Sequence, residues 1–335
     1  MAKLKIGKLV VIGTGLIGGS FALALKRARA VKRVTGVGRT RRNLAEALRL
    51  KIVDEVTQDP ARAVRDADLV LLATPVGQMP AVMTAIAPHL PAHAVVTDAG
   101  STKRDVVACA RRFLGRHFSR FVPGHPIAGT ERSGATAAFP ELFRDRNVIL
   151  TPQRETAASA ARLVRQAWEA CGARVVTLAA DEHDAILAGV SHLPHIVAYA
   201  LVNMLARRRN AARLFSLSAG GLRDTVRIAG SSPEMWADIC VANRDALLAA
   251  LEDYENELEE MRAAIEGADV ADLGACSRRR AARARSGWSG NAPRAGDGLE
   301  TSRPGAHPAG PRHGQAAGLE EHLQSHPVAR RAGRR

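Results

Sequence analysis

The segment from Lys8 to Gly18 constrains the fold of this chain more than any other. It reads KLVVIGTGLIG, an apolar strand that runs directly into the pattern G-x-G-x-x-G at the start of a helix. In this pattern Gly13 makes the tight turn, Gly15 lets the backbone approach a pyrophosphate, and Gly18 lets the helix pack closely on the strand. The segment therefore predicts a βα unit that binds a dinucleotide, with a tight turn that binds nothing as the alternative.

Short apolar segments alternate with amphipathic ones through residues 1–178. Amphipathic helices are expected at Arg41–Leu50 and Ala157–Ala170. Strands that alternate with helices form βαβ units and a largely parallel sheet, so this region is predicted to be an α/β domain of the Rossmann type, which binds the dinucleotide. Seven segments are expected as strands: Leu9–Ile12, Val34–Val37, Leu69–Ala73, Ala94–Thr97, Phe121–Val122, Asn147–Leu150 and Arg174–Leu178.

Residues 179–274 are predicted to form a second domain that is entirely helical. In its last part, leucines and other apolar residues recur at helical spacing, which is typical of a core or of a subunit interface. A helical domain of this size buries little surface alone, so we expect this stripe to form the interface of a homodimer. Three helices are expected: Asp181–Ala206, Ala211–Arg227 and Pro233–Ala264.

The net charge of +15 is unevenly distributed along the chain. Residues 275–335 contain twelve arginines and four acidic residues, and so carry +8 of it. This segment is rich in Arg, Gly, Pro, Ala and Ser, and it cannot bury enough surface to offset the entropy lost on ordering. It is therefore predicted to be a disordered basic tail. The smaller positive charge on the rest of the chain suits an enzyme with anionic ligands, so no nucleic-acid partner is expected.

The cysteines and the N-terminus indicate where the protein works. The four cysteines form no C-x-x-C pair and match no metal-ligand spacing, which predicts free thiols in a reducing compartment and no metal site. Lys3, Lys5 and Lys8 with the apolar run behind them imitate a secretory signal, but four glycines interrupt that run. No other stretch reaches the roughly 18 uninterrupted apolar residues of a membrane span. We expect a cytoplasmic protein with no membrane partner.

The residues after the second predicted strand bear on the choice of dinucleotide. The Asp or Glu that binds the ribose of NAD would follow this strand, but here Arg39 and Thr40 follow it. An arginine suits a 2′-phosphate, which a carboxylate would repel, so NADP is favoured over NAD. Small and polar residues at the ends of two further strands are expected around ribose and nicotinamide. The predicted cofactor-binding residues are Gly13, Gly15, Leu16, Ile17, Gly18, Arg39, Thr40, Thr74, Pro75 and Asp98.

The string from Gly124 to Gly134, GHPIAGTERSG, is the most specific in the chain. With four further strings, it makes residues 8–265 resemble the prephenate/arogenate dehydrogenase family. The resemblance implies a Rossmann-type domain followed by an all-helical dimerisation domain, as expected above. It also implies oxidative decarboxylation of a small molecule, prephenate or L-arogenate, with hydride transfer to NAD(P)+ in tyrosine biosynthesis. The further strings are DAGSTK (98–103), SHLPH (191–195), AGG (219–221) and TVRIAGSSPEMW (225–236).

The implied reaction needs a base at the ring hydroxyl of the substrate. The resemblance places the catalytic histidine at His125, and an imidazole near its ordinary pKa can accept that proton around neutral pH. Ser101 resembles the family serine that hydrogen-bonds both the histidine and the substrate hydroxyl. Its alternative interpretation is the N-cap of a helix over Lys103–Ala110.

The substrate carboxylates call for a guanidinium, whose planar fork binds a carboxylate through two hydrogen bonds. Arg227 matches the substrate-binding arginine of the family. His192 and His195 could pair on a metal, but no carboxylate at matching spacing supports this, and the resemblance suggests that at least one of them faces the active site. The other residues that resemble family positions at the substrate pocket or its entrance are Thr130, Glu131, Gly220 and Trp236.

Two other classes of protein stay open at this point. A β-hydroxyacid dehydrogenase or imine reductase also joins a Rossmann domain to helices, but it should carry a catalytic Lys or Asp on the first long helix after the sheet, where this chain has SHLPH. A non-catalytic protein that binds nucleotides or nucleic acids would use the positive charge, but it leaves HPIAGTERSG unexplained. The sequence does not separate prephenate from L-arogenate.

Overall fold

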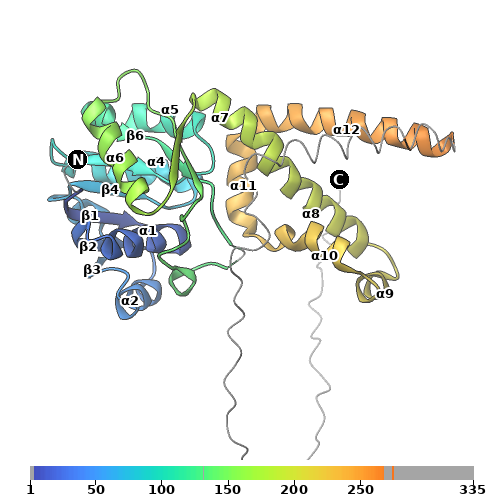
Figure 1. Ribbon diagram of the computed structural model, residues 1–335, viewed down its shortest axis with the longest axis horizontal. Helices are drawn as coiled ribbons and strands as arrows, with labels where there is room; N and C mark the ends of the chain where they lie inside the picture. Colours follow the sequence, from blue (N-terminus) through green and yellow to red (C-terminus); the bar gives the residue numbers. More distant parts are fainter. Residues whose placement is uncertain (1–3, 131, 268–273, 275–335) are drawn as a thin grey trace, which may run out of the picture. The chain divides into compact units, whose positions relative to one another are not determined.

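The computed structural model describes residues 4–130 and 132–267, together with Gly274. The chain up to Gly267 forms one compact unit. In Figure 1 the strands all belong to the first part of this unit, and only helices follow from α7 onward. The predicted tail at 275–335 lies outside the described residues.

A six-stranded parallel sheet forms the centre of the N-terminal part, in the order β3-β2-β1-β4-β5-β6. The first strand lies in the middle, where Leu9 pairs with Val34 on one side and with Leu69 on the other. This strand order is that of the Rossmann fold, whose ligands bind at the carboxyl ends of the strands, so the predicted fold class is confirmed. The strands are β1 (Ile6–Ile12), β2 (Val31–Val37), β3 (Glu55–Thr57), β4 (Leu69–Leu72), β5 (Val95–Asp98) and β6 (Phe121–Val122).

Helices cover both faces of this sheet (Figure 1). On one face Trp168 packs against Phe21 and Phe143, with ring centroids 4.5 and 5.1 Å apart. On the other face Met83 and Val106 are buried in a second apolar cluster. Each large apolar side chain that is fully buried stabilises the fold by roughly 1.5–3 kcal/mol. These helices are α1 (Leu16–Arg27), α2 (Arg41–Arg49), α3 (Pro60–Ala63), α4 (Met79–Ile86), α5 (Arg104–Phe113) and α6 (Ala158–Ala170), with 3-10 helices η1 (Val76–Gln78), η2 (Ala87–His89), η3 (Gly115–Arg120) and η4 (Ala135–Ala137).

A second, three-stranded sheet has the order β7-β8-β9. β7 (Gly124–Pro126) runs antiparallel to β8 (Asn147–Leu150), which runs parallel to β9 (Arg174–Thr177). In this sheet His125 pairs with Ile149. The sequence predicted neither β3 nor β7, because each is only three residues long and has no apolar run. The unpredicted β7 is the strand that carries His125.

The C-terminal part is helical, as predicted, but it is divided more finely. The run expected at Ala211–Arg227 is broken between Ser216 and Gly220, and the run expected at Pro233–Ala264 is broken at Asn243. Asn243 leaves the helical conformation, and its side-chain amide instead donates to the carbonyl of Asp184, 2.8 Å away. The helices are α7 (Ala180–Leu187), the π-helix η5 (Ala188–His192), α8 (Leu193–Ala206), α9 (Ala211–Ser216), α10 (Gly220–Val226), the 3-10 helix η6 (Arg227–Gly230), α11 (Pro233–Ala242) and α12 (Arg244–Glu266).

The continuous run from Ala180 to Ala206 is long and apolar enough to cross a membrane by length and composition alone. Its best window has a mean hydropathy of 1.6, and only 22% of that window is buried within the chain. A single helix of this kind is weak evidence for a membrane span, since the core helix of a soluble protein passes the same test. The sequence did not predict a membrane span here, because polar residues such as His192 and Asn203 interrupt the run.

A buried ion pair fastens β7 to the end of β5. Lys103 and Asp98 are both fully buried and hydrogen-bonded to each other. The Lys103 ammonium also donates to the carbonyl of Gly124 at 2.8 Å, and the N–H of Gly124 donates to Asp98 at 3.0 Å. The other oxygen of Asp98 accepts from the N–H of Gly100. The pair thereby fixes the residue that precedes His125, and the Asp98 carboxylate lies inside the fold instead of against the cofactor as predicted.

We expect Lys103→Met to lower the free energy of unfolding by about 3–5 kcal/mol, because it leaves the Asp98 charge buried without a partner. Urea unfolding measures this loss. The double variant Asp98→Asn/Lys103→Met removes both charges and should recover part of it. Arg111→Met, which breaks an exposed pair with Glu155, is the control and should leave the unfolding free energy nearly unchanged. A loss below about 1 kcal/mol for Lys103→Met would contradict the structural role of the pair.

Candidate functional site

The glycine-rich turn after β1 has the geometry that a dinucleotide requires. Gly13 has a φ of +103°, and a Cβ there would lie 2.3 Å from the carbonyl oxygen of Ala73. A Cβ on Gly18 would lie 2.1 Å from the carbonyl oxygen of Gly13, so only glycine lets α1 pack this closely. A Cβ on Gly15 would meet nothing within 4 Å. Since Gly15 lines a pocket at the N-terminus of α1, this open space fits a phosphate group bound by backbone N–H groups.

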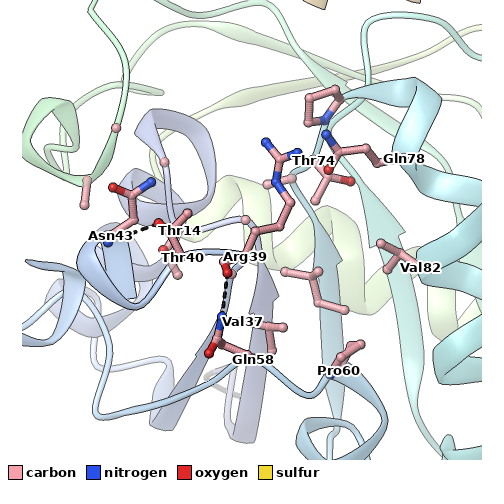
Figure 2. A pocket seen from close by; sticks show the side chains of 18 residues that line it. Thr14, Val37, Arg39, Thr40, Asn43, Gln58, Pro60, Thr74, Gln78 and Val82 are labelled. Carbon is pink, nitrogen blue, oxygen red and sulfur yellow. Dashed lines mark hydrogen bonds between the residues drawn. The ribbon is translucent and has the colours of Figure 1, made fainter. Parts of the chain in front are cut away.

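The dinucleotide pocket lies at the carboxyl edge of the sheet (Figure 2). Arg39 extends into it from the end of β2, and the backbone carbonyl of Arg39 accepts from the Gln58 side chain at 2.5 Å. Thr40 caps α2 by accepting from the N–H of Asn43. Among the described residues that line this pocket, none is acidic. Predicted cofactor-binding residues found in its lining are Gly13, Gly15, Arg39, Thr40, Thr74 and Pro75.

A second pocket adjoins the first and holds His125. The two pockets share Gly15, Ala73, Thr74, Pro75 and Gly134, so a ligand can extend from one into the other. The predicted residues Leu16, Ile17, Ser101 and Thr130 line the second pocket, whereas Gly18 is buried and lines neither pocket. The helical domain contributes residues just before α11 and within it to the pocket lining: Ser231, Ser232, Met235 and Ile239.

His125 is the first member of a chain of hydrogen bonds. Its Nδ1 lies 2.9 Å from Nε2 of His183, and Nδ1 of His183 lies 2.7 Å from Oδ1 of Asp184. His183 and Asp184 belong to α7 and are buried. Burial, followed by the proximity of His183, holds the pKa of His125 well below its ordinary value. The neutral imidazole is therefore the resting form, as a general base requires.

Asp184 also caps the first turn of α5. Its two carboxylate oxygens accept from the N–H groups of Lys103 and Arg104, each at 2.8 Å. Burial raises the pKa of Asp184, but hydrogen bonds from His183 and from these backbone groups outweigh burial and leave the pKa below its ordinary value. The carboxylate of Asp184, on a helix distant in sequence, thus makes the N-terminal capping hydrogen bonds that Ser101 was alternatively predicted to make.

Ser101 lies in a bend before α5, and the N-cap position belongs to Lys103. The alternative interpretation of Ser101 as this N-cap is therefore wrong. Ser101 lines the same pocket as His125. In the described part of the chain the hydrogen bond of the His125 ring is with His183 and not with Ser101.

His192, His195 and Trp236 pack together and are absent from the lining of this pocket. The ring of His195 stacks on Trp236 with centroids 3.8 Å apart. Asn243 donates to Nδ1 of His192 at 3.0 Å. Burial lowers the pKa of His192 to about 4, which keeps it neutral. Within the described residues no group of three His, Cys, Asp or Glu side chains could hold a metal ion.

The other predicted substrate residues lie away from the pocket lining or outside the described part. Arg227 is exposed at the start of η6, close enough to His195 to help lower the pKa of that ring after the larger effect of burial. Gly220 is exposed at the start of α10. Glu131 lies outside the described residues.

His183, Asp184 and Asn243 were not predicted from the sequence as site residues. The first two belong to the string DEHD at 181–184, which lies six residues ahead of the SHLPH string at 191–195. A histidine beside an aspartate, close in sequence to a string that resembles the family, could have been predicted as part of the active site. No sequence pattern indicated that α7 would bring this pair against His125.

Two family models match the chain. "Prephenate dehydrogenase, nucleotide-binding domain" matches residues 21–177, and "Prephenate dehydrogenase, dimerization domain" matches residues 179–277.

Relatives and solved structures agree with these matches. The chain is 40% identical to a cyclohexadienyl dehydrogenase of Zymomonas mobilis over 78% of this chain and 89% of the relative, and 36% identical to a prephenate dehydrogenase of Bacillus subtilis over 79% and 72%. A crystal structure of prephenate dehydrogenase from Aquifex aeolicus, in complex with hydroxyphenyl propionate and NAD+, superposes with a TM-score of 0.80 at 34% identity, covering 85% of this chain and 99% of that one. The chain belongs to the prephenate dehydrogenase family.

Proposed function

We propose that this protein oxidises and decarboxylates prephenate to 4-hydroxyphenylpyruvate, or L-arogenate to L-tyrosine, in tyrosine biosynthesis. One observation carries the assignment to these residues: His125 lines a pocket that shares five lining residues, Gly15 and Thr74 among them, with the dinucleotide pocket. The family membership and the relatives named above support the same reaction.

In this proposal Nε2 of His125 accepts the proton of the C4 hydroxyl, and the O–H electrons form the C4 carbonyl bond. The nicotinamide cofactor, when bound, accepts the hydride that leaves C4. The C1–carboxylate bond then breaks, CO2 leaves, and its electrons enter the ring, which becomes aromatic. His125 returns the proton to the resulting phenolate oxygen, so the imidazole ends in its resting state.

The remaining substrate contacts come from residues that line or flank the pocket. Ser101 and Thr130 offer hydroxyls within its lining. Arg227 is the proposed carboxylate ligand, because η6, which it begins, leads directly into Ser231 and Ser232 of the lining. Glu131, Gly220, His192, His195 and Trp236 remain proposed members of the substrate site or its surroundings.

NADP is the proposed cofactor, with NAD as the alternative. Arg39 faces the pocket at the end of β2, where NAD enzymes place a carboxylate. A guanidinium there can bind a 2′-phosphate through two hydrogen bonds.

We propose that the protein works as a cytoplasmic homodimer. Val190, Leu217 and Val241 of the helical domain are each at least 70% exposed in the single chain, although exposed apolar surface is costly. The apolar run Ala180–Ala206 is mostly unburied as well. A second copy covering these helices accounts for both observations and agrees with the dimerization domain that matches this region. The described cysteines are free thiols, which suits a reducing compartment.

Arg39→Asp is expected to lower the ratio of kcat/KM with NADP to kcat/KM with NAD by about 10- to 100-fold, the worth of a charge-assisted hydrogen bond. Steady-state kinetics with both cofactors measure the ratio. Arg42→Asp makes the same charge change on α2 outside the pocket lining, and is the matched control. An unchanged ratio in Arg39→Asp would defeat the NADP assignment.

Purified protein should turn over prephenate, L-arogenate or both with NAD(P)+, and His125→Asn should lower kcat by roughly 10²- to 10⁴-fold with little change in KM, because it removes only the base. Arg227→Ala should chiefly raise KM, by about 10- to 100-fold. Arg223→Ala, exposed on α10, is the control for the loss of an exposed arginine. Normal kinetics in both His125→Asn and Arg227→Ala would show the site assignment to be wrong.

The pH dependence of kcat/KM follows from His125. Neutral His125 is the active form, and its pKa lies below the ordinary 6.5 because of burial and His183. Activity should therefore be lost as the pH falls through that lowered pKa, and the acidic limb of the kcat/KM profile should lie below pH 6.5. An acidic limb above pH 6.5 would contradict this environment for the imidazole.

A further inference from the structure

We propose that His183 and Asp184 are positioning residues for catalysis: they set which nitrogen of His125 carries the proton, and they stabilise the positive charge that His125 acquires. This inference rests on the proposed role of His125 as the base. Neither residue lines the substrate pocket, so both act through the His125 ring.

When both imidazole rings are neutral, the hydrogen bonds leave a single arrangement of protons. Asp184 is ionised and accepts from two backbone N–H groups, so it can only accept from Nδ1 of His183. His183 then carries its proton on Nδ1, and its Nε2 has a free lone pair. Nδ1 of His125, 2.9 Å from that nitrogen, must donate to it. The neutral His125 ring is therefore unprotonated at Nε2, the nitrogen that remains to accept a proton.

The hydrogen bonds from His125 through His183 to Asp184 also counter surroundings that disfavour a positive charge on His125. Lys103, His183 and His192 all oppose a positive charge on His125, and Asp98 already pairs with Lys103. Asp184 is a carboxylate joined to the His125 ring through hydrogen bonds. When His125 becomes an imidazolium, the polarised His183 ring carries part of the charge toward Asp184, while the proton stays on His125 and remains available for the product oxygen. In serine proteases a buried carboxylate likewise orients the catalytic histidine and stabilises the imidazolium that forms.

The chain of hydrogen bonds joins the two domains. His125 lies on β7 of the α/β domain, whereas His183 and Asp184 lie on α7 of the helical domain. Asp184 is held from both sides, by the first turn of α5 and by the Asn243 amide on its backbone carbonyl. Docking of the helical domain therefore sets the protonation pattern of the base.

Kinetics of Asp184→Asn and His183→Leu test the proposal. Each should lower kcat by about 100-fold or more, with KM for substrate and cofactor within about threefold of wild type, because ring orientation and charge stabilisation are lost while the pocket lining stays intact. His117→Leu is the matched control, a buried histidine outside the chain of hydrogen bonds, and should keep kcat within threefold. A kcat within threefold of wild type in both test variants would overturn the proposal.

A second measurement does not depend on activity, and its deciding arm uses the wild-type protein. Nitrogen-15 NMR of histidine-labelled wild-type protein with NADP bound reports which ring nitrogen of each histidine carries a proton. We expect a protonated Nδ1 and an unprotonated Nε2 for His125, and the reverse in Asp184→Asn if that variant folds. A wild-type His125 protonated at Nε2 would overturn the proposed roles of His183 and Asp184. The assignment of His125 as the base is tested separately by His125→Asn, so the two ideas can fail independently.

Discussion

The buried ion pair between Asp98 and Lys103 is the interaction on which the position of the proposed base depends. It joins the end of a central strand to the backbone of Gly124, and so aligns the short strand that carries His125. β7 is only three residues long, so its ladder with β8 supplies few of the hydrogen bonds that position it. A fully buried pair is costly to desolvate. Here it offsets that cost with hydrogen bonds to three neighbouring groups.

From this anchor the fold assembles a site out of parts that are far apart in sequence. The parallel sheet brings the glycine turn, Thr74 and Ser101 to one edge, because the carboxyl ends of parallel strands meet there. α7 then places His183 and Asp184 behind the imidazole, and the residues around the start of α11 close the front of the pocket. The cofactor turn and the base are thus positioned by the α/β domain, whereas the protonation state of the base is governed by the helical one.

Much of this was predictable from sequence, for physical reasons that differ by element. The glycine turn is local, since Gly13 must adopt positive φ and Gly18 must lack a side chain. Apolar runs in the sequence predicted the central strands. By contrast, β7 and the break at Asn243 arise from tertiary hydrogen bonds that leave no periodic pattern. Asp98 was misplaced for the same reason: a carboxylate at a strand end suits a ribose until a buried lysine, five residues on, pairs with it.

The central claim is that Nε2 of His125 faces the carbon from which hydride leaves. A neutron crystal structure of the protein with NADP+ and a non-reacting substrate analogue tests it most directly, because it shows both the geometry and the protons. The account predicts Nε2 without a proton and within hydrogen-bond distance of the C4 oxygen of the analogue, beside the nicotinamide ring. An imidazole turned away from that oxygen, or protonated at Nε2, would contradict it.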